Sequence, residues 1–120
     1  MIRDILLVGA GSFVGGAARY LISLFMPSTD GFPWSTFIVN ILGCLLIGIL
    51  WGWMSRSVLS QSFYLFLSIG IGGGFTTFST FSKESLALLQ SGSYTTFAFY
   101  VSGSVVLGLL AVAAGFLITK

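Results

Sequence analysis

The sequence predicts an all-α membrane protein with four transmembrane helices. Of its 120 residues, 56% are hydrophobic and 7% are charged, whereas a soluble domain carries roughly 25% charged residues. The mean hydropathy is +1.04, and four apolar stretches reach the roughly 20 residues that cross the hydrocarbon core. We therefore expect residues 1–120 to form a single four-helix transmembrane domain in the cell membrane.

The four predicted spans are separated by short polar or proline-containing connections. They cover residues of about 5–25, 35–54, 63–89 and 94–118. The first span ends at Met26–Pro33, which holds two prolines and a glycine, because neither residue type continues a helix well. The third span is the longest, as expected if it contains an interruption.

The third span contains the most unusual stretch of the chain, Gly70–Phe81, which reads GIGGGFTTFSTF. Four of its first five residues are glycine, and phenylalanines and hydroxyl residues then recur at every third position. One interpretation is a helix broken at membrane depth, whose second half begins near Thr76 and directs free N–H groups toward the midplane. The other is a glycine-rich packing face whose hydroxyls bond to their own backbone. Periodicity alone leaves both interpretations open.

Polar residues within the spans need a partner, because an amide or a charge that faces lipid is costly. Asn40 either forms an interhelical hydrogen bond or lines a cavity. Arg19 either extends to the headgroups or faces an aqueous vestibule and concentrates anions there. The vestibule is favoured, since no acidic residue lies within helical reach on the same span. Lys83 and Glu84 are adjacent and point in different directions, and either can mark the water-exposed end of the third helix.

The composition excludes several classes of function. The chain has no histidine and one cysteine, Cys44, so a disulfide or a Cys/His metal site within one chain is excluded. The net charge of +2 is too small and scattered for nucleic-acid binding, and no catalytic constellation indicates an enzyme. No Asp or Glu lies deep in a span, which removes a proton relay and a cation filter. The remaining amide and hydroxyl donors suit a small anion or a neutral hydrogen-bonding solute.

Small residues at four-residue spacing predict close helix contacts. They form three pairs, Gly11/Gly15, Gly48/Gly52 and Gly70/Gly74. Because four short helices enclose a polar path poorly, these seams and the hydroxyls on several faces of the third helix favour a homodimer. The side with both termini carries three basic residues against two on the other side, a weak bias that permits insertion in both orientations.

Three stretches resemble the signature motifs of the Fluc/CrcB fluoride channel family: Gly15–Tyr20, Phe37–Gly43 and Gly72–Phe81. The resemblance covers essentially the whole chain, and the TTFSTF run is its most specific part. It implies a broken third helix that carries this run, and an antiparallel, dual-topology homodimer in a bacterial membrane. Such a dimer exports fluoride passively through two pores and lowers cytoplasmic fluoride.

The resemblance also implies roles for individual residues. Asn40 matches a pore asparagine that donates to fluoride, and Phe78 and Phe81 match paired pore phenylalanines whose ring edges face the ion. Several weak donors in series suit fluoride, since they replace its water and still release it. The family's hydroxyl track would include Ser79, Thr80 and, in the less distinctive fourth span, Ser104. Ser102 and Ser104 can instead bond to carbonyls of their own helix.

Two further roles follow from the resemblance. Arg19 would lie at the vestibule, and the backbone carbonyls of Gly73 and Thr76 would hold a structural sodium ion, Na⁺, at the dimer centre. The sodium site agrees with a broken helix, because an unwound backbone leaves carbonyls free to bind a cation.

Two rival functions remain to be compared with a channel. A small multidrug exporter is also a short four-span protein, but it needs a membrane-embedded carboxylate in its first span, and Ile5–Phe25 has none. A membrane scaffold would use the glycines and hydroxyls for packing only. Replacing Phe78 and Phe81 by isoleucine separates a scaffold from a channel, since a scaffold would still dimerise whereas a pore would lose conduction.

Overall fold

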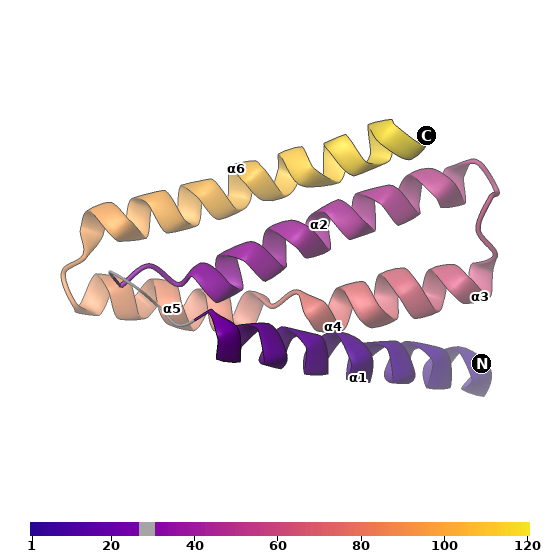
Figure 1. The fold of residues 1–120 in the computed structure, drawn as a ribbon, viewed down its shortest axis with the longest axis horizontal. Helices are drawn as coiled ribbons and strands as arrows, with labels where there is room; N and C mark the ends of the chain where they lie inside the picture. Colours follow the sequence, from indigo (N-terminus) through magenta and orange to yellow (C-terminus); the bar gives the residue numbers. More distant parts are fainter. Residues whose placement is uncertain (27–30) are drawn as a thin grey trace.

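The structure is a computed structural model that describes residues 1–26 and 31–120. Its described part contains four helices long and apolar enough to cross a membrane, at Ile2–Phe25, Trp34–Ser55, Gln61–Gln90 and Tyr94–Thr119. These bounds lie within three residues of the predicted spans, and the all-α class is confirmed. Both termini lie at the same end of the bundle (Figure 1). Residues 27–30 of the predicted first connection lie outside the described residues.

The first span, α1 (Ile2–Phe25), packs along the third span through glycines. A Cβ atom on Gly15 would lie 2.7 Å from the backbone nitrogen of Phe75, and one on Gly74 would lie 2.5 Å from the carbonyl oxygen of Ser12. Gly70 would meet the Cα of Gly11 at 2.9 Å. Any larger residue at these positions would force the two backbones apart, as in other small-residue helix seams.

The second and fourth spans, α2 (Trp34–Ser55) and α6 (Tyr94–Thr119), form the most extensive helix pair. A Cβ atom on Gly115 would lie 2.6 Å from the carbonyl oxygen of Leu45, and Gly48 packs equally closely on Val112. The Thr119 hydroxyl donates to the carbonyl of Ile49 at 2.9 Å. All three predicted glycine pairs are therefore used within one chain. Because these contacts need no second copy, the seams leave the expected homodimer untested.

The third span is broken, as one of the two interpretations of its sequence required. It consists of α3 (Gln61–Tyr64), the wider-turned helix η1 (Leu65–Gly72), α4 (Gly73–Phe75) and α5 (Phe78–Gln90). Between α4 and α5, Thr76 and Thr77 have extended backbone angles. The glycines before the break still form a packing face, so both interpretations hold, each for its own part of the stretch.

The second half of the third span begins at Phe78, two residues after the predicted start near Thr76. Thr77 caps it, since its Oγ1 accepts a hydrogen bond from the backbone N–H of Thr80 at 3.2 Å. Threonine is a favoured capping residue because its hydroxyl satisfies one of the free N–H groups of the first turn. The break lies beside the second half of α1 and the first half of α2 (Figure 1), where Arg19 and Asn40 bond to it.

Candidate functional site

A groove of about 290 Å³ runs past the break in the third span. Residues from α2, the break, α5 and α6 line it: Asn40, Cys44, Ile47, Thr76, Thr77, Phe78, Phe81, Ser104 and Val105. None of these side chains carries a formal charge at neutral pH. The lining therefore offers hydrogen-bond donors and the edges of aromatic rings at membrane depth, without a charged side chain.

The polar groups of the groove are only partly satisfied within the chain. The Ser104 hydroxyl oxygen is shielded from solvent and, among the described residues, has no hydrogen-bond partner. Buried hydroxyls are normally paired, so an orphan needs an explanation. The rings of Phe78 and Phe81 lie 5.9 Å apart at 40°, and the Phe78 side chain is 78% exposed. Phe78 therefore stands on the open side of the groove.

Asn40 holds the break in place. Its Nδ2 donates to the carbonyl of Thr77 at 3.0 Å, and its Oδ1 accepts from the Thr77 N–H at 2.8 Å. A side-chain amide has two N–H donors, so one donor remains for another acceptor in the groove. Asn40 thus satisfies both backbone groups of a residue outside any helix, which is a requirement at membrane depth. The sequence alternatives of an interhelical bond and a cavity-lining amide are both realised.

The carbonyls of the break are unequally satisfied. The Gly72 carbonyl accepts from both the N–H and the hydroxyl of Thr76, at 3.1 and 3.0 Å. The Gly74 carbonyl accepts from Arg19 Nε at 3.2 Å. Within residues 1–26 and 31–120, no hydrogen bond reaches the carbonyl oxygen of Gly73 or of Thr76. Gly73 is exposed, and a Cβ atom on it would meet nothing within 4 Å, so the backbone at Gly73 borders open space.

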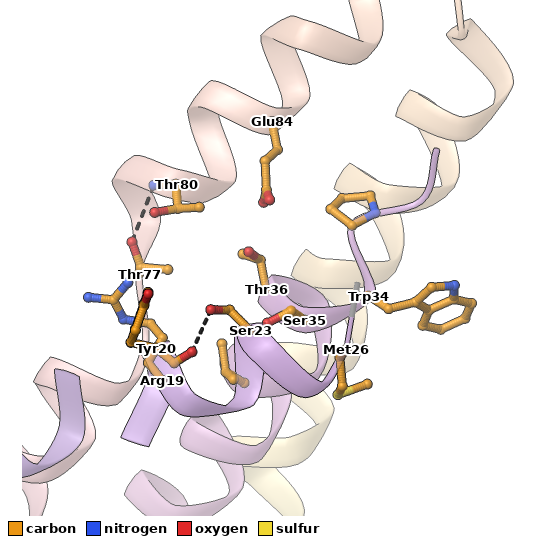
Figure 2. A pocket seen from close by; sticks show the side chains of 12 residues that line it. Arg19, Tyr20, Ser23, Met26, Trp34, Ser35, Thr36, Thr77, Thr80 and Glu84 are labelled. Carbon is orange, nitrogen blue, oxygen red and sulfur yellow. Dashed lines mark hydrogen bonds between the residues drawn. The ribbon is translucent and has the colours of Figure 1, made fainter. Parts of the chain in front are cut away.

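A second cavity of about 290 Å³ lies on the other side of Thr77, which lines both spaces. It is bounded by α1, the start of α2 and the first turns of α5, and Figure 2 shows Thr36, Thr80 and Glu84 pointing into it. Arg19 also lines it, although its Nε is bound to the third span. Arg19 therefore connects this cavity with the break.

Glu84 differs from the sequence-based description of a residue at a water-exposed helix end. Its neighbour Lys83 is exposed, but Glu84 is partly buried and accepts a hydrogen bond from the Tyr100 hydroxyl at 3.0 Å. Tyr100 is fully buried, and its ring centroid lies 5.1 Å from that of Phe81 in the groove. Glu84 and Tyr100 thus link the cavity to the groove. The sequence did not reveal this pair, because nothing in the sequence indicated that α5 and α6 bring the two residues together.

Comparison with known proteins identifies the family. Residues 6–116 match the family described as CrcB-like protein, Camphor Resistance (CrcB). The chain belongs to the CrcB-like family. It is 51% identical to the "Fluoride-specific ion channel FluC" of Phocaeicola vulgatus, with 94% of this chain and 95% of the relative covered. Proteins with the same name in Bacteroides fragilis and Chlorobium luteolum are 46% and 45% identical, covering 94% and 98% of this chain and 93% and 92% of the relatives.

Membership in the CrcB-like family confirms the resemblance found in the sequence motifs. The relatives are named as ion channels and not as enzymes. With four candidate membrane spans and bacterial relatives, the protein is a multi-pass bacterial membrane protein.

The structure brings together some of the site residues predicted from the sequence and separates others. Five of them share the groove: Asn40, Thr76, Phe78, Phe81 and Ser104. Arg19 and Thr80 line the cavity beyond Thr77. Ser79 lies on the exposed side of α5, where its hydroxyl is 3.3 Å from that of Thr77. Ser102 is exposed, so it does not share the position of Ser104.

Proposed function

We propose that this member of the CrcB-like family is a fluoride channel that lets the ion leave the cell passively and so lowers cytoplasmic fluoride. The observation that carries the proposal is the groove beside the break, which combines the amide of Asn40, the orphan hydroxyl of Ser104 and two phenylalanines, with no charged lining. The names of the relatives give the same ion.

The donors in the groove have the chemistry that a small, strongly hydrated anion requires. The free N–H of Asn40 and the hydroxyl of Ser104 can each replace one water of hydration, and the positive edges of Phe78 and Phe81 add weak attraction. A cationic side chain in the groove would bind the anion tightly and slow its release, whereas conduction needs binding at several weak sites. The uncharged lining therefore favours passage over storage.

The cavity beyond Thr77 supplies an entrance to the groove in this proposal. Thr77 lines both spaces, and Thr80 and Thr36 extend the hydroxyl lining toward the end of the bundle. In this cavity the Arg19 guanidinium attracts anions, and the Glu84 carboxylate repels them. The Tyr100 hydroxyl donates to Glu84, and this hydrogen bond disperses the negative charge of the carboxylate. The ion would pass from this vestibule to Ser104 by successive exchange of donors.

The proposed assembly is an antiparallel, dual-topology homodimer with two pores. Its support is the exposed break. Irregular backbone does not face lipid within the hydrocarbon core, yet Gly73 is exposed, and the carbonyls of Gly73 and Thr76 accept no hydrogen bond among the described residues. A second copy crossing at this point would cover them. The carbonyls of Gly73 and Thr76 from both copies would then supply four oxygen ligands to a sodium ion, which serves as a structural charge within the interface.

Ion efflux from liposomes tests the proposed function. Vesicles that contain the purified protein are loaded with fluoride or with chloride, and release is followed with an ion-selective electrode. We expect rapid fluoride release and retention of chloride. Folded protein that releases no fluoride would refute the channel, and the groove would then be a packing defect between helices.

Substitution of the two groove phenylalanines separates a channel from a membrane scaffold. Phe78→Ile with Phe81→Ile keeps apolar side chains but removes the ring edges that the proposal assigns to the ion. We expect fluoride efflux to be lost while the oligomeric state in detergent stays that of the wild type. Phe25→Ile with Phe99→Ile is the matched control, because both of these exposed side chains lie outside the groove and outside the two other cavities. Unchanged efflux from the first variant would contradict the assigned pore.

A further inference from the structure

A third cavity, of about 550 Å³, lies at the end of the bundle that holds both termini. It is formed where the start of α1 meets the start of the third span (Figure 1). Its lining comprises Arg3, Leu7, Ser60, Ser62, Phe63 and Phe66. It shares no residue with the groove or with the cavity beyond Thr77, so the proposed fluoride path does not account for it.

The cavity has a polar mouth and an apolar wall. At the mouth, Arg3 Nη2 donates to the Ser62 hydroxyl at 3.0 Å, and the Ser60 hydroxyl caps α3 by accepting from the Phe63 N–H at 3.3 Å. A guanidinium has five N–H donors, so four of those on Arg3 remain for another acceptor. The bond to Ser62 also fixes the direction of the arginine.

The apolar wall lies deeper in the membrane than the mouth. Leu7 follows Arg3 by four residues on α1, and Phe66 follows Ser62 by four residues on the third span. One helical turn advances about 5.4 Å along the axis, so each polar residue stands about one turn above an apolar one. The Phe63 side chain, 61% exposed, forms the open edge. A ligand that fits must be anionic at one end and apolar at the other.

We propose that this cavity binds the phosphodiester headgroup and the upper acyl chain of an anionic glycerophospholipid. The phosphate accepts from the free N–H donors of Arg3, and the chain lies along Leu7, Phe63 and Phe66. Charge favours an anionic lipid over a zwitterionic one. Arg3 and Asp4 lie in the first turn of α1, and Arg56 donates to the carbonyl of Thr119 beside Lys120. Three basic side chains therefore stand against one acidic side chain at this end of the described residues. Basic side chains at the membrane surface attract anionic lipids in this way.

Native mass spectrometry tests the lipid site. The full chain is reconstituted in vesicles of phosphatidylglycerol and phosphatidylcholine in equal parts, extracted gently, and the retained lipids are counted. We expect the wild type to retain phosphatidylglycerol preferentially, and Arg3→Gln to lower that preference about fivefold, the effect of one basic residue at an anionic surface. Arg56→Gln is the matched control, because it removes a charge from the same end but its guanidinium is bound to the Thr119 carbonyl, away from the cavity.

Three outcomes would overturn the lipid site. The first is an equal loss of preference in both variants, which would show that only net charge matters. The second is displacement of phosphatidylglycerol by soluble glycerol phosphate, which would show a site for a free phosphate and not for a lipid. The third is a wild type without preference together with a weakened dimer in Arg3→Gln, which would show that a second copy fills the cavity. Leu7→Ser, which keeps Arg3, should reduce retention of both lipids if the acyl chain lies where proposed.

Discussion

The hydrogen bonds between Asn40 and Thr77 lead to a prediction that distinguishes two roles of Asn40, namely stabilising the break in the third span and donating to an ion. In Asn40→Ala, the Thr77 N–H loses its acceptor at 2.8 Å and the Thr77 carbonyl loses its donor at 3.0 Å. A polar group left unsatisfied away from water costs about 1–3 kcal/mol. We expect the free energy of unfolding to fall by about 2–6 kcal/mol for the two groups, and fluoride efflux to be lost as well.

Ser104→Ala is the matched control for the Asn40 variant. Ser104 lines the same groove, but its hydroxyl has no partner to lose in the described part of the chain. We expect its free energy of unfolding to change by less than about 0.5 kcal/mol, as for a substitution that breaks no contact. Fluoride efflux should fall several-fold, because the ion loses one donor along its path.

Unfolding in mixed micelles with increasing dodecyl sulfate, followed by circular dichroism, measures the stability term, and liposome efflux measures conduction. The reasoning is refuted if Asn40→Ala unfolds at the wild-type midpoint, or if Ser104→Ala is equally destabilised. Asn40→Asp divides the effect, since a carboxylate still accepts from the Thr77 N–H but cannot donate to the Thr77 carbonyl. At least half of the stability loss should remain in that variant, because a carboxylate at membrane depth beside the Thr77 carbonyl adds a cost of its own.

Three other perturbations follow from the same structure. Gly15→Ala places a methyl group 2.7 Å from a backbone nitrogen of the third span and should lower the free energy of unfolding by about 1–3 kcal/mol. Gly16→Ala meets nothing within 4 Å and should stabilise α1 by about 0.5–1 kcal/mol. The same micelle titration compares the two variants, and equal midpoints would contradict the close packing of Gly15 on the third span. Tyr100→Phe removes the donor to Glu84 and should cost about 1–3 kcal/mol in that titration, while Tyr94→Phe on the exposed face should not. Replacing sodium by N-methylglucamine during purification should weaken the dimer measured by size-exclusion chromatography with light scattering, and an unchanged dimer would argue against the sodium site.

Several parts of the candidate site could be predicted because their signal is local. The run Gly70–Phe81 contains a stretch of glycines followed by a capping threonine, and both interpretations of it were realised within one segment. Asn40 is an amide within an apolar span, and the cost of burying it required a partner. In each case the residue type and its neighbours restricted the outcome before any contact was known.

Other parts depend on which helices become neighbours. The Glu84–Tyr100 pair and the orphan hydroxyl of Ser104 arise because α5 and α6 pack at a particular rotation. The role of Arg19 also changed: the expected vestibule residue lines a cavity, and in addition its Nε is bound to the Gly74 carbonyl. A helix sequence shows which residues share a face, but it does not show which neighbour that face meets.

The sequence by itself determined the membrane class and the four spans, because length and hydropathy are properties of each segment alone. It also limited Gly70–Phe81 to a break or a packing face. The tertiary structure decided the rest. It paired Gly11 and Gly15 with the third span, gave both backbone groups of Thr77 to Asn40, and left the carbonyls of Gly73 and Thr76 free. These outcomes depend on helix packing, since a backbone group within the membrane finds a partner only where the fold places a neighbour beside it.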